Sequence, residues 1–183
     1  KALQAGTSHY LGQNFAKAFD VKFQNDKNEE EYVYATSWGV STRLIGALIM
    51  VHGDDKGLRL PPKVAPIQVV IVPIFRSDED KNKILNYIDS LTKGFDTLNI
   101  RYLFDDRTTV SPGFKFNEWE MKGVPIRLEV GSRDIESNNI IYSRRDTNIK
   151  NEISINGAHQ YLNDVLENIQ NSLFEQAQTF LND

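Results

Sequence analysis

Residues 67–75 read IQVVIVPIF, a run that is apolar apart from Gln68 and is rich in β-branched side chains. Apolar residues on both alternating faces predict a strand that is buried on both sides, as in the sheet of an α/β domain. The amphipathic segment 78–95 follows, and Ser77 stands where a helix N-cap is expected. A buried strand followed directly by an amphipathic helix predicts an α/β fold.

Further strand and helix patterns follow this pair along the chain. Strands are predicted at residues 100–104 (IRYLF), 125–130 (PIRLEV) and 140–145 (IIYSRR). Residues 114–123 (FKFNEWEMKG) predict a short helix that stops at a glycine, and residues 158–181 repeat apolar side chains at helical spacing. Together these patterns indicate one small domain with a mixed sheet and helices on its faces.

The proline-rich segment 60–66, LPPKVAP, separates this part of the chain from what precedes it. Prolines so closely spaced exclude a helix interior or a central strand, so we expect a domain junction here. The predicted domains are therefore residues 1–62 and 63–183.

The first predicted domain has a different pattern. Residues 31–38 (EYVYATSW) predict a strand, and the charged stretch 24–31 (QNDKNEEE) predicts an exposed loop or hairpin tip before it. From Val40 the chain is apolar on nearly all sides, which predicts a helix buried on most of its faces. Residues 52–57 (HGDDKG) predict a loop.

Composition excludes several classes of protein. The chain has 21 Lys and Arg against 25 Asp and Glu, a net charge of −4, so any nucleic-acid contact must be local. It has no cysteine, which excludes disulfides, thiolate nucleophiles and Cys-type zinc sites. No apolar run approaches the length of a membrane span, so we expect no membrane segment and a cytoplasmic location. His52 and His159 are expected to be structural, and no metal site is predicted.

Arg43 stands at the head of the apolar segment and lacks a nearby counter-charge. A cation in the first turn of a helix is opposed by the helix dipole, and the next acidic residues, Asp54 and Asp55, lie at the other end. Its partner is therefore either a carboxylate on another element or an anionic ligand, with phosphate the first candidate.

Three stretches extend this interpretation: residues 3–15 (LQAGTSHYLGQNF), 36–62 (TSWGVSTRLIGALIMVHGDDKGLRLPP) and 111–134 (SPGFKFNEWEMKGVPIRLEVGSRD). In order and approximate spacing they resemble the prolyl-tRNA synthetase family of the archaeal and eukaryotic type, a group of class II synthetases. The resemblance implies that residues 63–183 form a mixed-sheet anticodon-binding domain. Residues 1–62 would be the last portion of an antiparallel-sheet catalytic domain.

The resemblance also implies roles for residues of the first domain. Arg43 would be catalytic, stacking on the adenine of ATP and approaching its triphosphate. The implied ATP-binding residues are Gln4, Thr7, Ser41 and Arg43, and the implied proline-binding residues are His9, Ser37, Trp38 and Gly39. From the residues alone, a hydrogen-bonded structural role for His9 and a core position for Trp38 are the alternatives.

In the second domain the resemblance implies contacts to the guanines of an anticodon. Phe116 would stack, Glu120 and Arg127 would read base edges, and Arg133 and Asp134 would lie beside them. An aromatic, acidic and arginine set suits unpaired bases. Ser132 stands where the family commonly has proline, and ordinary surface ion pairing is the alternative for Arg133 and Asp134.

The activity implied is that of a proline-tRNA ligase, which uses ATP and Mg²⁺ and acts on proline and tRNA(Pro) as a homodimer. Earlier signature motifs of the family are not in this sequence, so we expect the chain to be part of a longer enzyme and to be inactive alone. The alternative is a stand-alone RNA-binding module without catalysis.

Overall fold

The computed structural model describes residues 3–75 and 77–182, and the chain divides into two compact units between Val51 and His52. This division precedes the proline-rich segment 60–66, because a residue before that segment already bonds to the rest of the second unit: Asp54 Oδ2 accepts a hydrogen bond from Arg145 Nη1 at 2.9 Å. Within the described ranges no helix is both long and apolar enough to cross a membrane.

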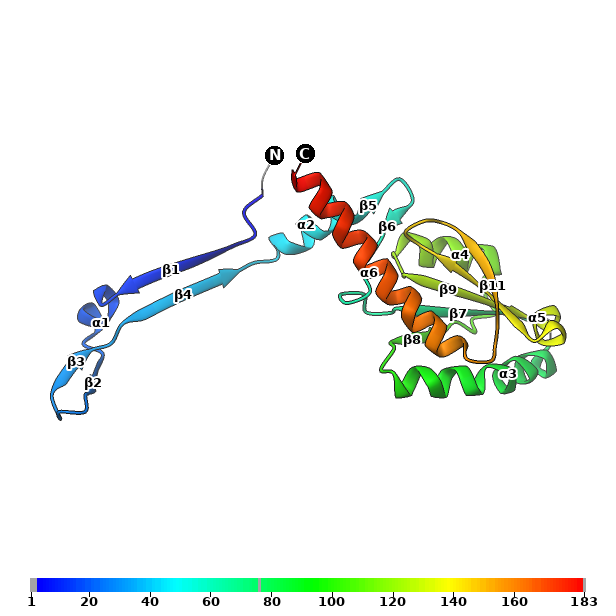
Figure 1. Ribbon diagram of the computed structural model, residues 1–183, viewed down its shortest axis with the longest axis horizontal. Coiled ribbons are helices and arrows are strands. Elements are labelled where there is room, and N and C mark those ends of the chain that lie inside the picture. Colours follow the sequence, from blue (N-terminus) through cyan, green and yellow to red (C-terminus); the bar gives the residue numbers. More distant parts are fainter. Residues whose placement is uncertain (1–2, 76, 183) are drawn as a thin grey trace. The chain divides into compact units, whose positions relative to one another are not determined.

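A mixed sheet forms the centre of the second unit, as predicted. Among the described residues it has five strands in the order β11-β10-β9-β7-β8 (Figure 1). Strand β7 is parallel to β8 and β9, whereas β10 is antiparallel to β9 and β11. The bounds are Val69–Ile74 for β7, Tyr102–Phe104 for β8, Ile126–Gly131 for β9, Asn139–Arg144 for β10 and Lys150–Ser154 for β11.

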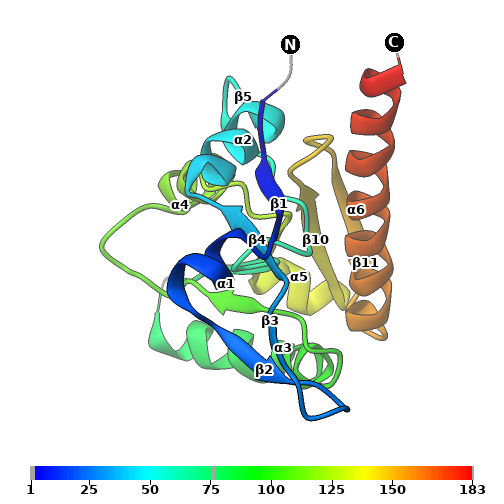
Figure 2. The same ribbon diagram turned by 90° about the vertical axis from the view of Figure 1, so that its left-hand side faces the viewer.

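Helices cover both faces of this sheet. Helices α3 (Asp78–Thr97) and α6 (Ala158–Asn182) pack on one face, and α4 (Pro112–Met121) packs on the other. Figure 2 shows α4 and α6 on opposite sides of the strands. Alternation along β7 explains this layering: Val69 and Ile71 join the core under α3 and α6, while Val70 and Val72 contact Trp119 of α4. Residues 69–73 of the predicted run are therefore buried on both sides, as predicted, whereas Ile74 at its end is exposed.

Local signals fix the ends of the elements. The Ser77 hydroxyl accepts the Asp80 N–H at 3.2 Å at the start of α3, so the predicted N-cap is confirmed. Pro73 lies within β7, but β8 pairs only with Val69–Ile71, so the proline stands beyond the end of that neighbour.

Some short elements were not predicted from the sequence. In the second unit they are the helix α5 (Ser132–Ser137), strand β11, and a hairpin in the segment 52–57 that had been expected to be a loop. Two-residue strands β5 (Gly53–Asp54) and β6 (Gly57–Leu58) form this hairpin. The polar and glycine-rich sequence of these strands does not predict β-structure. Tertiary contacts, and not strand propensity, hold them in place.

The first unit contains two antiparallel pairs and two helices. Strand β1 (Gly6–Gly12) pairs with β4 (Ala35–Val40), and β2 (Lys22–Gln24) pairs with β3 (Glu30–Tyr32). The predicted hairpin tip at 24–31 is confirmed, since it joins β2 to β3. A short helix, α1 (Asn14–Phe19), follows β1, and α2 (Arg43–His52) follows β4.

The predicted burial of the apolar helix is wrong for the described chain. Helix α2 has no buried residue there, and Ile45, Met50 and Val51 are each more than half exposed. The apolar pattern is typical of a helix that packs against another surface. No element of the described chain supplies that surface.

Two glycines allow the β5–β6 hairpin to contact the end of α4 closely. Gly57 has φ +128°, and a side chain there would collide with the Met121 backbone. Gly123 has φ +76°, and a Cβ added there would lie 2.6 Å from the Leu58 Cβ. Backbone meets backbone at this crossing, which fixes the hairpin over the C-terminal turn of α4.

Substitution of Gly57 by alanine tests this crossing. We expect Gly57→Ala to lower the free energy of unfolding of the second unit by about 1–3 kcal/mol, because it adds both strain and a clash. Chemical denaturation measures the change. Gly113→Ala is the control, since a Cβ there meets nothing within 4 Å. Equal stability of the two variants would contradict the close contact.

Candidate functional site

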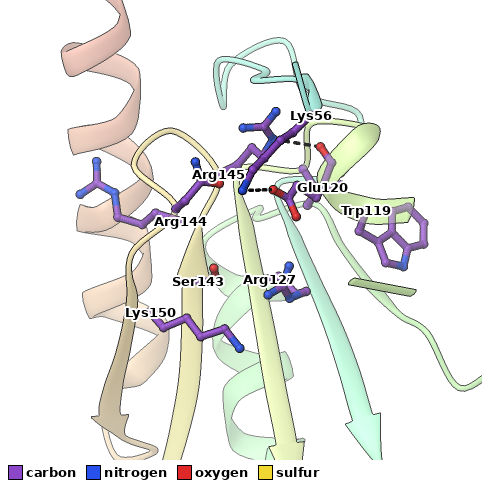
Figure 3. Close-up of a pocket in the computed structure, with 10 residues that line it drawn as sticks. Lys56, Trp119, Glu120, Arg127, Ser143, Arg144, Arg145 and Lys150 are labelled. Carbon is purple, nitrogen blue, oxygen red and sulfur yellow. Dashed lines mark hydrogen bonds and ion pairs between the residues drawn. The ribbon is translucent and has the colours of Figure 1, made fainter. Parts of the chain in front are cut away.

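A hollow of about 180 Å³ lies on the α4 face of the sheet, where the β5–β6 hairpin, α4, β9 and β10 meet (Figure 3). Within the described part of the chain, its lining includes one carboxylate, that of Glu120. Its other charged side chains are cationic: Lys56, Arg127, Arg144, Arg145 and Lys150. The local charge of this hollow is therefore opposite in sign to the net charge of the chain, which is −4.

Sheet register explains why cations gather on this face. Arg127 of β9 lies opposite Ser143 of β10, and Ser143 lies opposite Lys150 of β11. Directly opposed residues share a face, so these side chains form a row across the sheet. The Arg127 guanidinium lies 4.4 Å from the centre of the Phe116 ring, and the Lys150 ammonium lies 5.5 Å from it. Phe116 therefore supports two cations at the edge of the hollow.

The carboxylates around the hollow do not fully balance these cations. Arg127 Nη2 and Lys150 Nζ both bond to Oε1 of the buried Glu129, at 3.0 and 2.7 Å. The other three cations each have one carboxylate, in the pairs Lys56–Glu120, Arg144–Asp146 and Arg145–Asp54. Among the described residues, five cations thus meet four carboxylates, and the excess positive charge favours an anionic ligand.

Glu120 is the acidic group that faces the hollow. Its Oε1 lies 3.2 Å from Lys56 Nζ, and its backbone carbonyl accepts the Arg145 Nε–H at 2.9 Å. Its side chain is 21% exposed, so the carboxylate is accessible but held by its neighbours. A carboxylate in this setting can accept two parallel N–H donors from a planar ligand.

The structure thus brings together three of the five residues predicted to contact an anticodon: Phe116, Glu120 and Arg127. Arg133 and Asp134 lie past the far end of β9, in the first turn of α5. Asp134 Oδ2 accepts the Gly131 N–H at 2.7 Å and caps that helix. Both residues line a separate hollow with Asp80 and are not gathered with Glu120.

Sequence reasoning missed four cations of the hollow: Lys56, Arg144, Arg145 and Lys150. Lys56 lies in a segment interpreted only as a loop, and Lys150 lies in a strand that was not predicted. Arg145 is buried, which its place in the polar sequence SRRD does not suggest. The alternation along β10 and β11 was the one signal that could have placed Lys150 beside Arg127.

In the first unit a second hollow, of about 290 Å³, gathers all four residues predicted to bind ATP. Arg43 Nη1 donates to Gln4 Oε1 at 3.1 Å, and the Arg43 N–H donates to the Ser41 hydroxyl at 3.3 Å. Thr7 lines the same hollow. Within residues 3–75 and 77–182 no carboxylate pairs with Arg43, so its charge faces an amide and open space rather than a distant Asp or Glu.

The residues predicted to bind proline lie along β1 and β4. His9 lies opposite Ser37, and Thr7 lies opposite Gly39, on one face of the pair. Trp38 lies opposite Ser8 on the other face, where it is 79% exposed and borders a hollow of about 370 Å³. The alternative of a core position for Trp38 is wrong for the described chain. His9 and Ser37 are brought together, and Trp38 points away from them.

No cluster of three or more metal-binding side chains occurs in the described ranges. The acidic groups near the hollows are instead engaged with arginine and lysine.

Comparison with known proteins now defines the class of the chain. The family described as the anticodon binding domain matches residues 68–164, which is more than half of the chain. The chain therefore belongs to the anticodon-binding-domain family, and its five-stranded sheet and helices are the fold of that domain.

Curated relatives then give a more specific likeness. The chain is 57% identical over 177 residues to a proline-tRNA ligase of Flavobacterium psychrophilum, covering 97% of this chain and 36% of the relative. It is 54% identical over 178 residues to the proline-tRNA ligase of Salinibacter ruber, an alignment that covers 97% of this chain and 36% of the relative. For Bacteroides fragilis the identity is 52% over 180 residues, with 98% and 36% covered. The predicted resemblance to prolyl-tRNA synthetases is confirmed, whereas the archaeal and eukaryotic type stays a prediction. The chain spans 36% of the length of these relatives.

The pair Asp54–Arg145 holds the hairpin against the rest of the site. Arg145 is buried and its Nη1 donates to Asp54 Oδ2 at 2.9 Å. Hydrogen bonds from Arg145 lower the pKa of Asp54 from 3.8 to about 2. The pair is therefore charged at neutral pH, and its loss would leave the buried Arg145 without a counter-ion.

Asp54→Asn tests this pair through its pH dependence. At pH 7 we expect the free energy of unfolding of the variant to be about 1–3 kcal/mol lower than that of the wild type. Because folding lowers the pKa of Asp54, its stabilising effect is complete above pH 3.8 and is lost as the pH falls towards 2. The difference between the two proteins should therefore shrink over that range in denaturant titrations.

The neighbouring substitution Asp55→Asn is the control and should change the free energy of unfolding by less than about 0.5 kcal/mol at pH 7. A difference between Asp54→Asn and wild type that stays constant down to pH 2 would contradict the ion pair.

Proposed function

We propose that this chain is part of a proline-tRNA ligase, which activates proline with ATP and transfers it to tRNA(Pro). In this proposal the second unit reads the anticodon, and the first unit contributes part of the ATP and proline site. The observation that carries the proposal is the hollow that combines Glu120, the Arg127–Phe116 pair and an excess of positive charge on an acidic chain.

The chemistry of the hollow suits an unpaired guanine. The Glu120 carboxylate can accept the ring N–H and the amino group of guanine, and Arg127 can donate to the carbonyl and ring nitrogen on the other edge. Two of the N–H groups of Arg127 bond to Glu129, which leaves the others for a ligand. In this proposal Phe116 stacks on a base of the anticodon, and its ring also lies 4.4 Å from the Arg127 guanidinium. The cations of the hollow attract the phosphates of the RNA strand.

We propose Arg133 and Asp134 as contacts to a neighbouring nucleotide, because the separate hollow at α5 lies at the other end of β9. Asp134 would then act through its carboxylate while it caps α5, and Arg133 would supply the positive charge.

For the first unit we propose that Gln4, Thr7, Ser41 and Arg43 bind ATP. The support is their shared hollow and the unbalanced charge of Arg43. A guanidinium can both stack on adenine and neutralise phosphate. His9, Ser37, Trp38 and Gly39 are proposed for proline. In this proposal Mg²⁺ accompanies the ATP phosphates, and the complete protein is a cytoplasmic homodimer.

Substitution of Glu120 tests base reading. We expect Glu120→Ala to weaken binding to a tRNA(Pro) anticodon stem-loop by about 1–3 kcal/mol, because the guanine donors lose their acceptor. Binding to the same stem-loop with its guanines replaced by adenines should change little. Fluorescence anisotropy with labelled RNA measures both affinities.

Glu79→Ala is a matched control, since Glu79 also pairs with a lysine, Lys83, at 2.7 Å but lies on α3. It should leave both affinities unchanged. An equal loss on both RNAs with Glu120→Ala would refute base reading by Glu120.

Substitution of Arg43 tests the nucleotide site. In the complete protein that contains this chain, Arg43→Ala should slow proline-dependent exchange of pyrophosphate into ATP by about 100-fold or more, because a charge that stabilises the phosphates is lost. Arg43→Lys should recover only part of the rate, since lysine cannot stack or donate bidentately. Lys27→Ala, in the exposed β2–β3 loop, is the control. Exchange at the wild-type rate in Arg43→Ala would exclude the proposed role.

A further inference from the structure

We propose that Lys56, in the β5–β6 hairpin, binds a phosphate of the RNA backbone. In the free protein Lys56 pairs with Glu120, and on binding it exchanges this carboxylate for a phosphate beside the guanine that Glu120 accepts. The inference rests on the proposed function of the hollow. The hairpin precedes residues 68–164, so the match to the anticodon-binding-domain family does not include Lys56.

The backbone of the hairpin is held firmly at the site. Asp54 is anchored by the buried Arg145, which also bonds to the Glu120 carbonyl. Asp54 Oδ1 accepts the Lys56 N–H at 2.9 Å, and the next residue, Gly57, packs against Met121. The Cα of Lys56 is therefore fixed beside the end of α4 that carries Glu120.

The side chain of Lys56, in contrast, is held only at its tip. It is 59% exposed, and its Nζ lies 3.2 Å from Glu120 Oε1. In Figure 3 the ammonium group of Lys56 reaches across to Glu120 at the mouth of the hollow. Exposed pairs of this kind are weak and exchange readily for another partner. A fixed backbone with a free, flexible stem allows the charge to move without moving the hairpin.

Binding of a base creates the need for this movement. When the Glu120 carboxylate accepts the two N–H donors of guanine, Lys56 loses its counter-ion. The hollow already has one more cation than carboxylates, because Arg127 and Lys150 share Glu129. A neutral base cannot balance Lys56, whereas a phosphate of the same strand can, since each nucleotide carries one. The ammonium group offers three donors to the phosphate oxygens.

Salt-dependent binding of the 183-residue chain to the anticodon stem-loop tests this exchange. We expect Lys56→Gln to weaken binding about three- to fivefold at low salt. The slope of log Kd against log salt concentration should fall by about 0.7, the value for one phosphate contact to a single strand. Preference for guanine over adenine should remain. Lys56→Arg keeps the charge and should keep the slope.

Lys83→Gln is the matched control, because Lys83 is 60% exposed and pairs with Glu79 on α3. It should leave the affinity and the slope unchanged. A stem-loop with a neutral methylphosphonate on either side of the guanine identifies the phosphate. At the contacted position, the methylphosphonate should weaken binding of the wild type by as much as Lys56→Gln weakens binding of the unmodified stem-loop. Combining the methylphosphonate with Lys56→Gln should cause no further loss. Free inorganic phosphate, added at matched ionic strength, should not remove the difference in RNA affinity between the wild type and Lys56→Gln.

The outcomes separate this inference from the function on which it rests. Unchanged or tighter binding by Lys56→Gln, with an unchanged slope, would overturn the phosphate role and leave Lys56 as a partner of Glu120 alone. If Glu120→Ala also fails to alter guanine preference, or the wild type does not bind the stem-loop, the proposed function falls and this inference falls with it. Denaturant unfolding of Lys56→Gln is the check on the hairpin contacts, and we expect a free energy of unfolding equal to that of the wild type.

Discussion

The buried guanidinium of Arg145 is the interaction on which the geometry of the hollow depends. It bonds to Asp54 in the hairpin and to the Glu120 carbonyl at the end of α4, while its own N–H donates to the Pro125 carbonyl before β9. Three segments far apart in sequence are thereby joined through one residue. A buried charge is costly unless it is fully bonded, so each of these contacts constrains the others. Because Arg145 fixes the surrounding backbone, the accessible side chains of Lys56 and Lys150 can change position without disturbing the hollow.

The fold of the second unit could be predicted from the sequence because its signals are local. The apolar run at 67–75, the cap at Ser77 and the periodicity of residues 158–181 each depend on neighbours in sequence, and each was confirmed. The short strand β11 and the hairpin at 53–58 depend instead on contacts with distant residues. Glycines at 57 and 123 matter only together, through a backbone crossing that no single stretch of sequence reveals.

The candidate sites were predictable only in part, for a related reason. The resemblance supplied Glu120 and Arg127, but strand register is needed to show that Lys150 lies in their row. In the first unit, Gln4 and Arg43 are brought together because β1 pairs with β4 and α2 begins directly after it. Helix α2 was predicted to be buried because it is apolar on nearly all sides, but a sequence pattern does not show which surface covers a helix.

The outer strands of the sheet have a consequence for how the second unit behaves in solution. Strand β8 pairs over only three residues, and Pro73 removes an amide donor from β7 just beyond it. The other outer strand, β11, carries Lys150 and Glu152 in its short sequence. Edge strands that are short, charged or flanked by proline pair poorly with a strand of another chain. The sheet of the second unit should therefore resist edge-to-edge aggregation, even though part of one of its faces stays open to a ligand.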